Sequence, residues 1–430
     1  MGPDKPIVTS LLQDDFYTFP MNRFAQEHYP EVRVEYALKN RTTDVRLAEL
    51  IDIGELAEHL DHVRSLRFTS GELHWLGGTY EYNELMFPIE FIRFIKDLRM
   101  PEYDLEIGRD GQYDLRFAGP WPFAIQWEIK ALLIINTLLN KARMKGATRN
   151  EKRAIWASGE VKLAEKIAAI KKYGSINTGV SPTRYQSFSF SDFGTRRCFS
   201  PEWQDHVVSV LKEEFPNEFR GTSNCHLARK YELMPMGTNA HQVQMVLAAL
   251  AEENGEDISQ SQFKSYKMWG ETFPGGGLKI ILPDTFGSPN FFENAPAELA
   301  EWRGVRGDSG DLIYEGTRTV KWFRKHGKDP MQKIYIPSDG LTLPSIFRIL
   351  RHFSGIIPVS AGWGSNLTND MVDDPRFRPI SIIIKPLRVN GRGVVKLSNN
   401  IAKAMGDPKD IERYKAVFNY KESHFEAPTY

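Results

Sequence analysis

Ile334-Tyr335-Ile336-Pro337-Ser338-Asp339-Gly340 shows in one short stretch the unit that decides the fold. An apolar segment typical of a buried strand runs directly into a polar cluster that contains glycine, and a helical pattern follows. The same order recurs where Ile356-Ile357-Pro358-Val359 precedes Gly362-Trp363-Gly364-Ser365-Asn366. Repeated succession of strand, polar cluster and helix is typical of a parallel α/β barrel or open sheet.

Five further clusters of this kind lie upstream, each after a short apolar or β-rich segment. They are Ser191-Asp192-Phe193-Gly194-Thr195-Arg196-Arg197, Gly221-Thr222-Ser223-Asn224, Gly237-Thr238-Asn239-Ala240-His241, Asp284-Thr285-Phe286-Gly287 and Arg306-Gly307-Asp308-Ser309-Gly310-Asp311. Because the carboxyl ends of parallel strands meet at one edge, we expect all seven clusters to converge on a single site.

The chain is too long for a single ordinary core. It has 430 residues, whereas single hydrophobic cores stop growing near about 250–300 residues. We expect three parts: an N-terminal α+β domain over residues 1–149, an α/β barrel over residues 150–380, and a C-terminal segment, residues 381–430, that packs back on the N-terminal domain.

The N-terminal region mixes helical and strand patterns. Residues 14–28 are expected to form a helix, and residues 32–38 alternate in the manner of a strand. Residues 103–107 and 113–117 flank an Asp110-Gly111 pair, which predicts a β-hairpin.

Composition excludes several classes of protein. Lys and Arg number 55 and balance 55 Asp and Glu, so the chain lacks the overall positive charge of a nucleic-acid binder. No uninterrupted apolar run approaches the roughly 18–20 residues that span a membrane. Two cysteines, Cys198 and Cys225, cannot build a disulfide framework, which favours a reduced, cytoplasmic setting.

Glycines at the ends of two consecutive strands point to phosphate. Gly340, Gly362 and Gly364 each follow a short apolar segment, and bare amides at a strand-to-helix junction can direct several N–H groups at one anion. Each glycine alone is better explained as a tight turn, but two such loops in succession favour a phosphate monoester. The chain carries neither the dinucleotide fingerprint nor a P-loop.

Charged residues at other strand ends complement these glycines. Asp284 and Asp308 supply carboxylates of the kind that bind Mg²⁺ together with substrate phosphates, although Asp also caps helices. Arg196, Arg197 and Arg306 supply the opposite charge. A guanidinium can bind a carboxylate or phosphate with two parallel hydrogen bonds.

His241 and two aromatic residues complete the candidate site. A neutral imidazole at the start of a helix can act as a base, a metal ligand or a phosphate acceptor. Zinc-type ligation is disfavoured because no His or Cys lies at metal-binding spacing from it, and a structural role stays open. Phe193 and Tyr17 can sandwich a planar ring or simply pack in the core.

Taken in order, these clusters resemble those of the nicotinate phosphoribosyltransferase family, a type II phosphoribosyltransferase family. The resemblance extends over nearly the whole chain, through Asp15-x-Tyr17, Trp127-Glu128, the clusters quoted above and Lys396-Leu397-Ser398. It implies an irregular seven-stranded parallel α/β barrel with an N-terminal α+β domain completed by the C-terminal segment. It also implies a homodimer whose active sites are shared between subunits.

The resemblance implies a specific reaction. Nicotinate and phosphoribosyl pyrophosphate would give nicotinate mononucleotide and pyrophosphate, the first step of NAD salvage from nicotinate, with ATP hydrolysis coupled through a phosphohistidine. By motif, His241 is the phosphohistidine, and Asp284 and Asp308 are catalytic residues that hold Mg²⁺. The ring-stacking residues are Phe193 and the partner subunit's Tyr17. Nicotinate would be bound by Arg196, Ser223, Thr238 and Arg306, and phosphoribosyl pyrophosphate by Arg197, Gly340, Gly362, Gly364 and Ser365.

Ser223 indicates the substrate. The closely similar nicotinamide enzymes carry aspartate at this position, where it can accept a hydrogen bond from the amide. A serine hydroxyl can instead donate to the carboxylate of nicotinate, and an aspartate there would repel it. Four positions depart from the usual family pattern without removing a group that the chemistry needs: Thr18, Gln242, Thr342 and Ser365.

Three alternatives differ from this interpretation. The first is a nicotinamide phosphoribosyltransferase. The second is a metal-dependent hydrolase on an α/β barrel, which would use Asp284, Asp308 and His241 as ligands and would need further histidines such as His206 or His352 nearby. The third is a non-catalytic phosphate-binding barrel.

Overall fold

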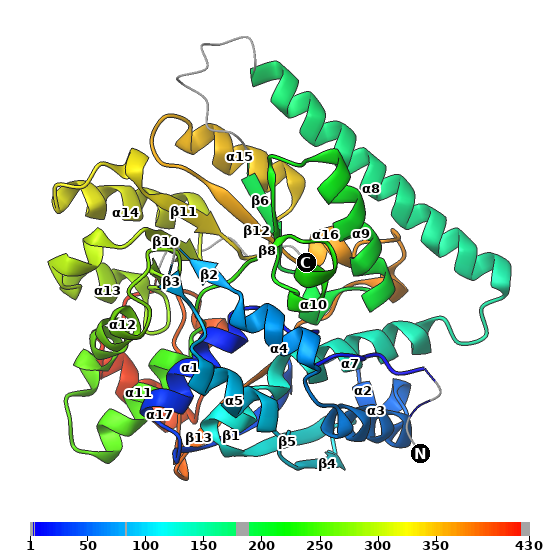
Figure 1. Cartoon of the computed structure of the whole chain (residues 1–430), viewed down its shortest axis with the longest axis horizontal. Helices are drawn as coiled ribbons and strands as arrows, with labels where there is room; N and C mark the ends of the chain where they lie inside the picture. Colours follow the sequence, from blue (N-terminus) through cyan, green and yellow to red (C-terminus); the bar gives the residue numbers. More distant parts are fainter. Residues whose placement is uncertain (1–2, 4, 82–83, 178–188, 423–430) are drawn as a thin grey trace.

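The computed structural model describes residue 3 and residues 5–81, 84–177 and 189–422 (Figure 1). In the view of Figure 1, parallel strands occupy the centre, an antiparallel sheet lies below them, and helix α8 runs along the outer edge. The C-terminal segment predicted over residues 381–430 extends into residues that lie outside this description.

Two parallel sheets form the centre, in the strand orders β12-β6-β7-β8 and β11-β10-β9. The strands are β6 Ser189–Asp192, β7 Phe219–Thr222, β8 Met234–Pro235, β9 Ile280–Ile281, β10 Gly304–Gly307, β11 Ile334–Pro337 and β12 Ser360–Trp363. A parallel bridge between Tyr335 and Val359 joins the two sheets. Each of the seven clusters lies at the end of one of these strands, which confirms the predicted succession of strand and cluster.

Helices follow these strands along the chain. They are α9 Pro201–Glu214, α10 Cys225–Lys230, α11 Gln242–Glu253, α12 Ser261–Thr272, α13 Ser288–Asn294, α14 Leu312–Lys325, α15 Leu343–Phe353 and α16 Ser365–Thr368. Asp311 caps α14, because its carboxylate accepts hydrogen bonds from the amides of Ile313 and Tyr314. Asp311 is therefore a structural cap, whereas Asp308 in the same cluster makes its contacts within the site.

The antiparallel sheet has the strand order β14-β13-β1-β5-β4. Its strands are β1 Arg33–Asn40, β4 Tyr103–Ile107, β5 Tyr113–Pro120, β13 Ile382–Val389 and β14 Arg392–Gly393. The predicted strand over residues 32–38 and the predicted hairpin are confirmed. Since β13 pairs with β1, the late part of the chain is built into the sheet formed by the early part; the domain boundaries themselves stay a prediction.

The remaining helices belong mostly to the N-terminal part of the chain; α8 lies along the outer edge of the parallel-strand region (Figure 1). They are α1 Thr18–His28, α2 Leu47–Leu50, α3 Ile53–Ser65, α4 Ser70–Gly77, α5 Ile89–Asp97, α6 Trp121–Ala124, α7 Trp127–Arg143, α8 Arg149–Asn177 and α17 Pro408–Val417, and a short strand pair is formed by β2 Tyr80–Glu81 and β3 Glu84–Leu85. The stretch Trp121–Arg143 is long and apolar enough to cross a membrane, but 94% of its apolar window is buried within the protein. It is packed in the manner of a core helix.

The expected helix over residues 14–28 is wrong over its first four residues, since α1 begins only at Thr18. The segment before it hydrogen-bonds to the end of β7 instead: the Phe16 amide donates to the Ser223 carbonyl at 2.7 Å, and the Cys225 amide donates to the Asp14 carbonyl at 3.0 Å. The Asp14 carboxylate is fully buried in an ion pair with Lys130 of α7. These bonds hold the segment, which consists of turns and one bridge between Asp15 and Asn224, against the strand ends.

Gly304, the first residue of β10, tests the tight pairing of the two strands β10 and β11. A Cβ atom added there would lie 2.1 Å from the Ile334 carbonyl oxygen, so Gly304→Ala must push the strands apart. We expect a loss of about 1–3 kcal/mol in the free energy of unfolding, measured by urea denaturation.

Gly270 in α12 provides the matched control. A Cβ atom there would meet Trp302 at 3.5 Å, an ordinary contact, and alanine is the better helix former. Equal stability of Gly304→Ala and Gly270→Ala would contradict the strand pairing described here.

Candidate active site

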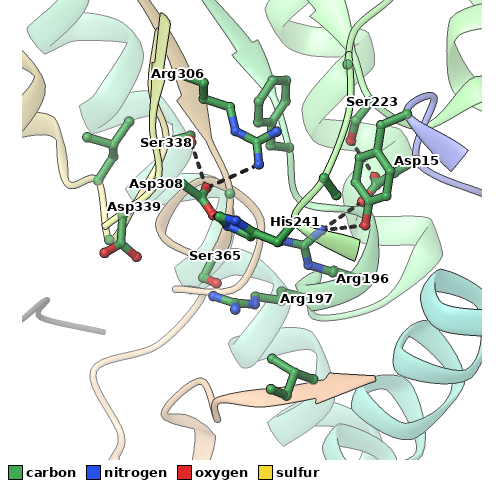
Figure 2. Close-up of a pocket in the computed structure, with 18 of the residues that line it drawn as sticks. Asp15, Arg196, Arg197, Ser223, His241, Arg306, Asp308, Ser338, Asp339 and Ser365 are labelled. Atoms are coloured by element: carbon green, nitrogen blue, oxygen red, sulfur yellow. Dashed lines mark hydrogen bonds and ion pairs between the residues drawn. The ribbon is translucent and has the colours of Figure 1, made fainter. Parts of the chain in front are cut away.

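One cavity opens at the carboxyl ends of the parallel strands, and Figure 2 shows the side chains that face it. Of the residues predicted for the site, it brings together Tyr17, Phe193, Arg196, Arg197, Ser223, His241, Arg306, Asp308, Gly340, Gly364 and Ser365. The strand-end clusters therefore converge as expected. Asp284, Thr238 and Gly362 lie beside this cavity and not in its lining.

A second cavity of about 870 Å³ adjoins the first on the strand side. Phe193, Gly237 and Arg306 line both cavities, and Thr238 and Gly362 line the second. Gly362 has a steric reason to be glycine, because a Cβ atom there would lie 2.5 Å from the Phe193 ring. The structure thus places Gly362 behind the Phe193 ring.

His241 directly precedes α11, and its ring lies between two hydrogen-bond partners. Its Nε2 is 3.0 Å from Oδ2 of Asp308, and its Nδ1 is 2.9 Å from Oγ1 of Thr285. An ionised carboxylate only accepts hydrogen bonds, so Nε2 carries the proton and the lone pair resides on Nδ1, which accepts from the Thr285 hydroxyl. The ring orientation is fixed from both sides.

The surroundings of His241 and Asp308 determine which of the two side chains is charged. Burial lowers the pKa of His241 to about 4, and the nearby Lys396 ammonium adds to this effect. Burial alone would raise the pKa of Asp308, but the Arg306 guanidinium and the hydrogen bond from His241 outweigh it and hold that pKa well below its usual range. A neutral imidazole therefore contacts an ionised carboxylate near neutral pH.

Asp284 lies close to His241 but outside the lining of the main cavity. Its Oδ2 accepts a hydrogen bond from the Ser309 hydroxyl at 2.5 Å, and its Oδ1 lies 4.0 Å from Nε2 of His241. Within the described part of the chain, this Oδ1 is buried without a hydrogen-bond partner. One atom each from His241, Asp284 and Asp308 lies within 4.8 Å of the others. Since Nε2 of His241 carries a proton, the two carboxylates are the groups that fit a divalent cation here.

Asp15, which the sequence interpretation gave no role, organises the opposite wall (Figure 2). Its carboxylate accepts a hydrogen bond from the Ser223 hydroxyl at 2.6 Å and pairs with Arg196 at 3.3 Å. Arg196 also donates to the Tyr17 hydroxyl at 3.0 Å. Tyr17 thus lines the cavity of its own chain, and a contribution from the partner subunit's Tyr17 stays a prediction.

The same contact changes the explanation for Ser223. Its hydroxyl proton is directed at Asp15, so the serine is not the free donor that the sequence suggested. A carboxylate already lies at this wall, and it is neutralised by Arg196. What matters at position 223 is a neutral side chain that can hydrogen-bond to Asp15.

Four cations reach the cavity from segments outside the strand-end clusters, and the sequence interpretation assigned a role to none of them. They are Arg41, Lys385, Lys396 and Lys403. Lys385 on β13 pairs with Glu128 of α7 at 2.5 Å, and Lys403 pairs with Asp339 at 2.6 Å. Of these four cations, only Lys396 belongs to a motif quoted for the family resemblance, Lys396-Leu397-Ser398; the sequence pattern did not indicate the other three.

Two family models match this chain. The model described as the Nicotinate phosphoribosyltransferase (NAPRTase) family matches residues 188–422, which is more than half of the 430 residues, and the model of the NAPRTase N-terminal domain matches residues 12–136. The chain belongs to the nicotinate phosphoribosyltransferase family.

Solved structures of nicotinate phosphoribosyltransferases share the fold over their full length. The enzyme from Porphyromonas gingivalis is 26% identical with a TM-score of 0.82, and the match covers 96% of this chain and 100% of that one. The enzyme from Vibrio cholerae is 28% identical with a TM-score of 0.83, and the match covers 97% of this chain and 95% of that one.

Gln242, one of the four positions that depart from the family pattern, does not line the cavity. It is fully buried and accepts a hydrogen bond from the Tyr36 hydroxyl at 2.5 Å, while its amide lies 3.5 Å from the Glu128 carboxylate. A glutamate here would place a second buried carboxylate beside Glu128, so the neutral amide suits this site.

The histidines that a metal hydrolase would require lie elsewhere. His206 hydrogen-bonds to Glu160 on α8, and His352 lies 3.4 Å from the Thr317 hydroxyl on α14. Among the described residues that line the main cavity, His241 is the single histidine. The three proposed ligands do come together, but the described cavity lining lacks the further histidines that the hydrolase alternative requires.

The pKa of His241 provides a test of this electrostatic description. Because the Lys396 ammonium lowers that pKa and the Asp308 carboxylate raises it, Lys396→Met should raise the pKa above about 4 and Asp308→Asn should lower it further. A raised pKa means that the protonated imidazole persists to higher pH. Titration of the imidazole resonances by NMR measures both shifts.

Lys403→Met serves as the control, since its ammonium is held by Asp339. We expect it to leave the His241 pKa where it is. Shifts of the same sign in Lys396→Met and Asp308→Asn would contradict the arrangement described for these three groups.

Proposed function

We propose that this chain is a nicotinate phosphoribosyltransferase that joins nicotinate to phosphoribosyl pyrophosphate and releases pyrophosphate. The observation that carries the proposal is the convergence of a buried His–Asp pair, opposed cations and an aromatic wall in one cavity, within a chain that belongs to this family. The product is nicotinate mononucleotide, formed in the first step of NAD salvage from nicotinate.

The phosphorylated substrate suits the cationic side of the main cavity. Displacing pyrophosphate from the anomeric carbon builds negative charge on the leaving group, and fixed cations lower that barrier. Arg197 and Lys403 line the main cavity together with Gly340, Gly364 and Ser365, and Lys403 pairs with Asp339, the neighbour of Gly340, which supports placing the phosphoribosyl pyrophosphate there. Asp284 and Asp308 would hold Mg²⁺, which when bound neutralises phosphate charge; the unpartnered oxygen of Asp284 supports this assignment.

Nicotinate suits the junction of the two cavities. Phe193 and Arg306 line both of them, so one can contact the ring while the other binds the carboxylate. The pyridine nitrogen is already a nucleophile, and holding it against the anomeric carbon suffices without a general base. Thr238 borders the same junction, and Arg196 and Ser223 with Tyr17 form its far wall.

His241 is proposed to accept the phosphoryl group of ATP. With the Nε2 proton donated to Asp308, the Nδ1 lone pair is available once the Thr285 hydroxyl rotates away. The low pKa of the imidazole keeps this nucleophile unprotonated at all pH values above about 4. Phosphorylation would add negative charge next to Asp308 and so alter how the site binds phosphates.

The finer fold and setting belong to the same proposal. We propose that β6 to β12 form the irregular seven-stranded barrel, supported by the bridge between the two parallel sheets and by the second cavity, which residues from all these strands line. We place the enzyme in the cytoplasm. A homodimer stays our prediction for the assembly, although Tyr17 reaches the site of its own chain.

One assay tests the reaction. Purified protein is incubated with nicotinate, phosphoribosyl pyrophosphate and Mg²⁺, with and without ATP, and nicotinate mononucleotide is measured. We expect turnover that ATP increases, and we expect His241→Ala to lose that increase while keeping the ATP-free rate. Labelled phosphate from ATP should remain on the wild type and not on His241→Ala; label on the variant would refute the assignment of His241.

Substitution of Ser223 tests the choice of substrate. Ser223→Asp would place a second carboxylate about a hydrogen-bond length from Asp15, and Arg196 cannot neutralise both. We expect the KM for nicotinate to rise by about tenfold or more, since a like-charge contact of this kind is worth about 1.4 kcal/mol or more.

Ser223→Ala separates charge from the loss of a hydrogen bond. It removes the donor to Asp15 without adding a carboxylate, so its KM for nicotinate should rise less than that of Ser223→Asp. Nicotinamide is tested in parallel as the alternative substrate. Unchanged nicotinate kinetics in Ser223→Asp, or faster turnover of nicotinamide by the wild type, would overturn the choice of nicotinate.

A further inference from the structure

The second cavity runs along the inside of the parallel strands and away from the main cavity. Its lining includes the first residues of several strands, among them Met234 of β8, Ile280 of β9 and Ile334 of β11, at the end opposite to the strand-end clusters. At the other end, Phe193 and Arg306 also line the main cavity. The cavity therefore connects the proposed nicotinate position with the amino-terminal ends of the strands.

The far end of this cavity opens to solvent. Met234 has 61% of its surface exposed, and Arg220 on β7 and Arg303, directly before β10, are also exposed. All three line the cavity. This end is therefore a second opening to the site, at the opposite end of the strands from the main cavity.

Charge distinguishes this opening from the main one. Among the described residues of its lining, the charged side chains are Arg220, Arg303 and Arg306, and none is acidic. The main cavity instead mixes cations with the carboxylates of Asp15, Asp308 and Asp339. In the described part of the lining the charged groups are thus arginines, and Arg220 and Arg306 lie near its two ends, an arrangement that attracts an anion.

The walls between these arginines suit a small aromatic ring. Ile280, Ile336 and Val359 give apolar surface, while Ser191 of β6 supplies a polar group. The Ser191 side chain is 2% exposed, and its hydroxyl has no hydrogen-bond partner in the described part of the chain. A buried hydroxyl without a partner is costly unless a ligand or water satisfies it.

We propose that this second cavity is the route by which a monoanionic aromatic carboxylate enters the site, with Arg220 and Arg303 at its mouth and Ser191 as a polar contact on the way to Arg306. The inference rests on the proposed function, since nicotinate is the aromatic carboxylate consumed there. The phosphoribosyl donor uses the other opening. The nucleophile then remains free to enter after the larger, multiply charged donor has filled the main cavity.

Arg220→Glu tests the charge of the mouth. This side chain is exposed and lies outside the lining of the main cavity. At low salt we expect kcat/KM for nicotinate to fall about tenfold, the scale of electrostatic steering, with kcat and kcat/KM for phosphoribosyl pyrophosphate unchanged. The difference should shrink as added salt shortens the Debye length from about 10 Å at 0.1 M.

Met234→Trp tests the width of the mouth by a second means. It replaces an exposed side chain at the opening with a bulkier one, and we expect a similar selective loss in kcat/KM for nicotinate that salt does not remove. Arg388→Glu, an equal charge change on β13 and outside both cavity linings, is the control and should leave nicotinate kinetics unchanged.

The outcomes are distinguishable. If the wild type turns over but Arg220→Glu and Met234→Trp keep wild-type nicotinate kinetics, the route is refuted and the proposed function stands. A parallel fall in kcat/KM for both substrates also refutes it, because the route serves only one of them. If the wild type forms no nicotinate mononucleotide, the proposed function fails first and this inference with it.

Discussion

Ion pairs between distant parts of the chain hold the charged side chains of the site in place, and the rest of the arrangement depends on them. These pairs are Asp15–Arg196 at 3.3 Å, Glu128–Lys385 at 2.5 Å and Asp339–Lys403 at 2.6 Å. Burying a charge is costly unless a partner compensates it. Because each pair joins two separate segments, the N-terminal segment, the strand ends and the C-terminal segment must meet in one arrangement for any of these charges to be accommodated.

The same constraint explains how the site can hold many cations and still fold. Seven cations line the main cavity, and three carboxylates offset part of their mutual repulsion. A phosphorylated ligand carries negative charge, so its binding compensates the excess of cations over carboxylates in the cavity lining. His241 is kept neutral within this field while Asp308 is kept ionised, and groups whose pKa values are driven apart in this way can take different roles in one reaction.

The sequence predicted the parts of the site that follow a local pattern. Phe193, His241 and Asp308 lie at the ends of short strands, and parallel pairing alone brings such positions together. Asp15 and Tyr17 were harder to predict, because their stretch looks helical and tertiary hydrogen bonds to the end of β7 override that preference. Lys385 and Lys403 could not be placed from spacing at all, since they reach the cavity through the pairing of β13 with β1.

Two openings of different charge fit the demands of a displacement at a sugar carbon. The incoming nucleophile and the departing pyrophosphate must lie on opposite faces of the sugar, as in other single displacements at an anomeric centre. Both substrates of the proposed reaction are anions, so a single shared mouth would make the first to bind repel the second. The strands separate the two paths, and Arg306 lines both cavities where they meet. One guanidinium can therefore hold the carboxylate of the ring while it contacts Asp308, 3.6 Å away, on the side of the phosphates.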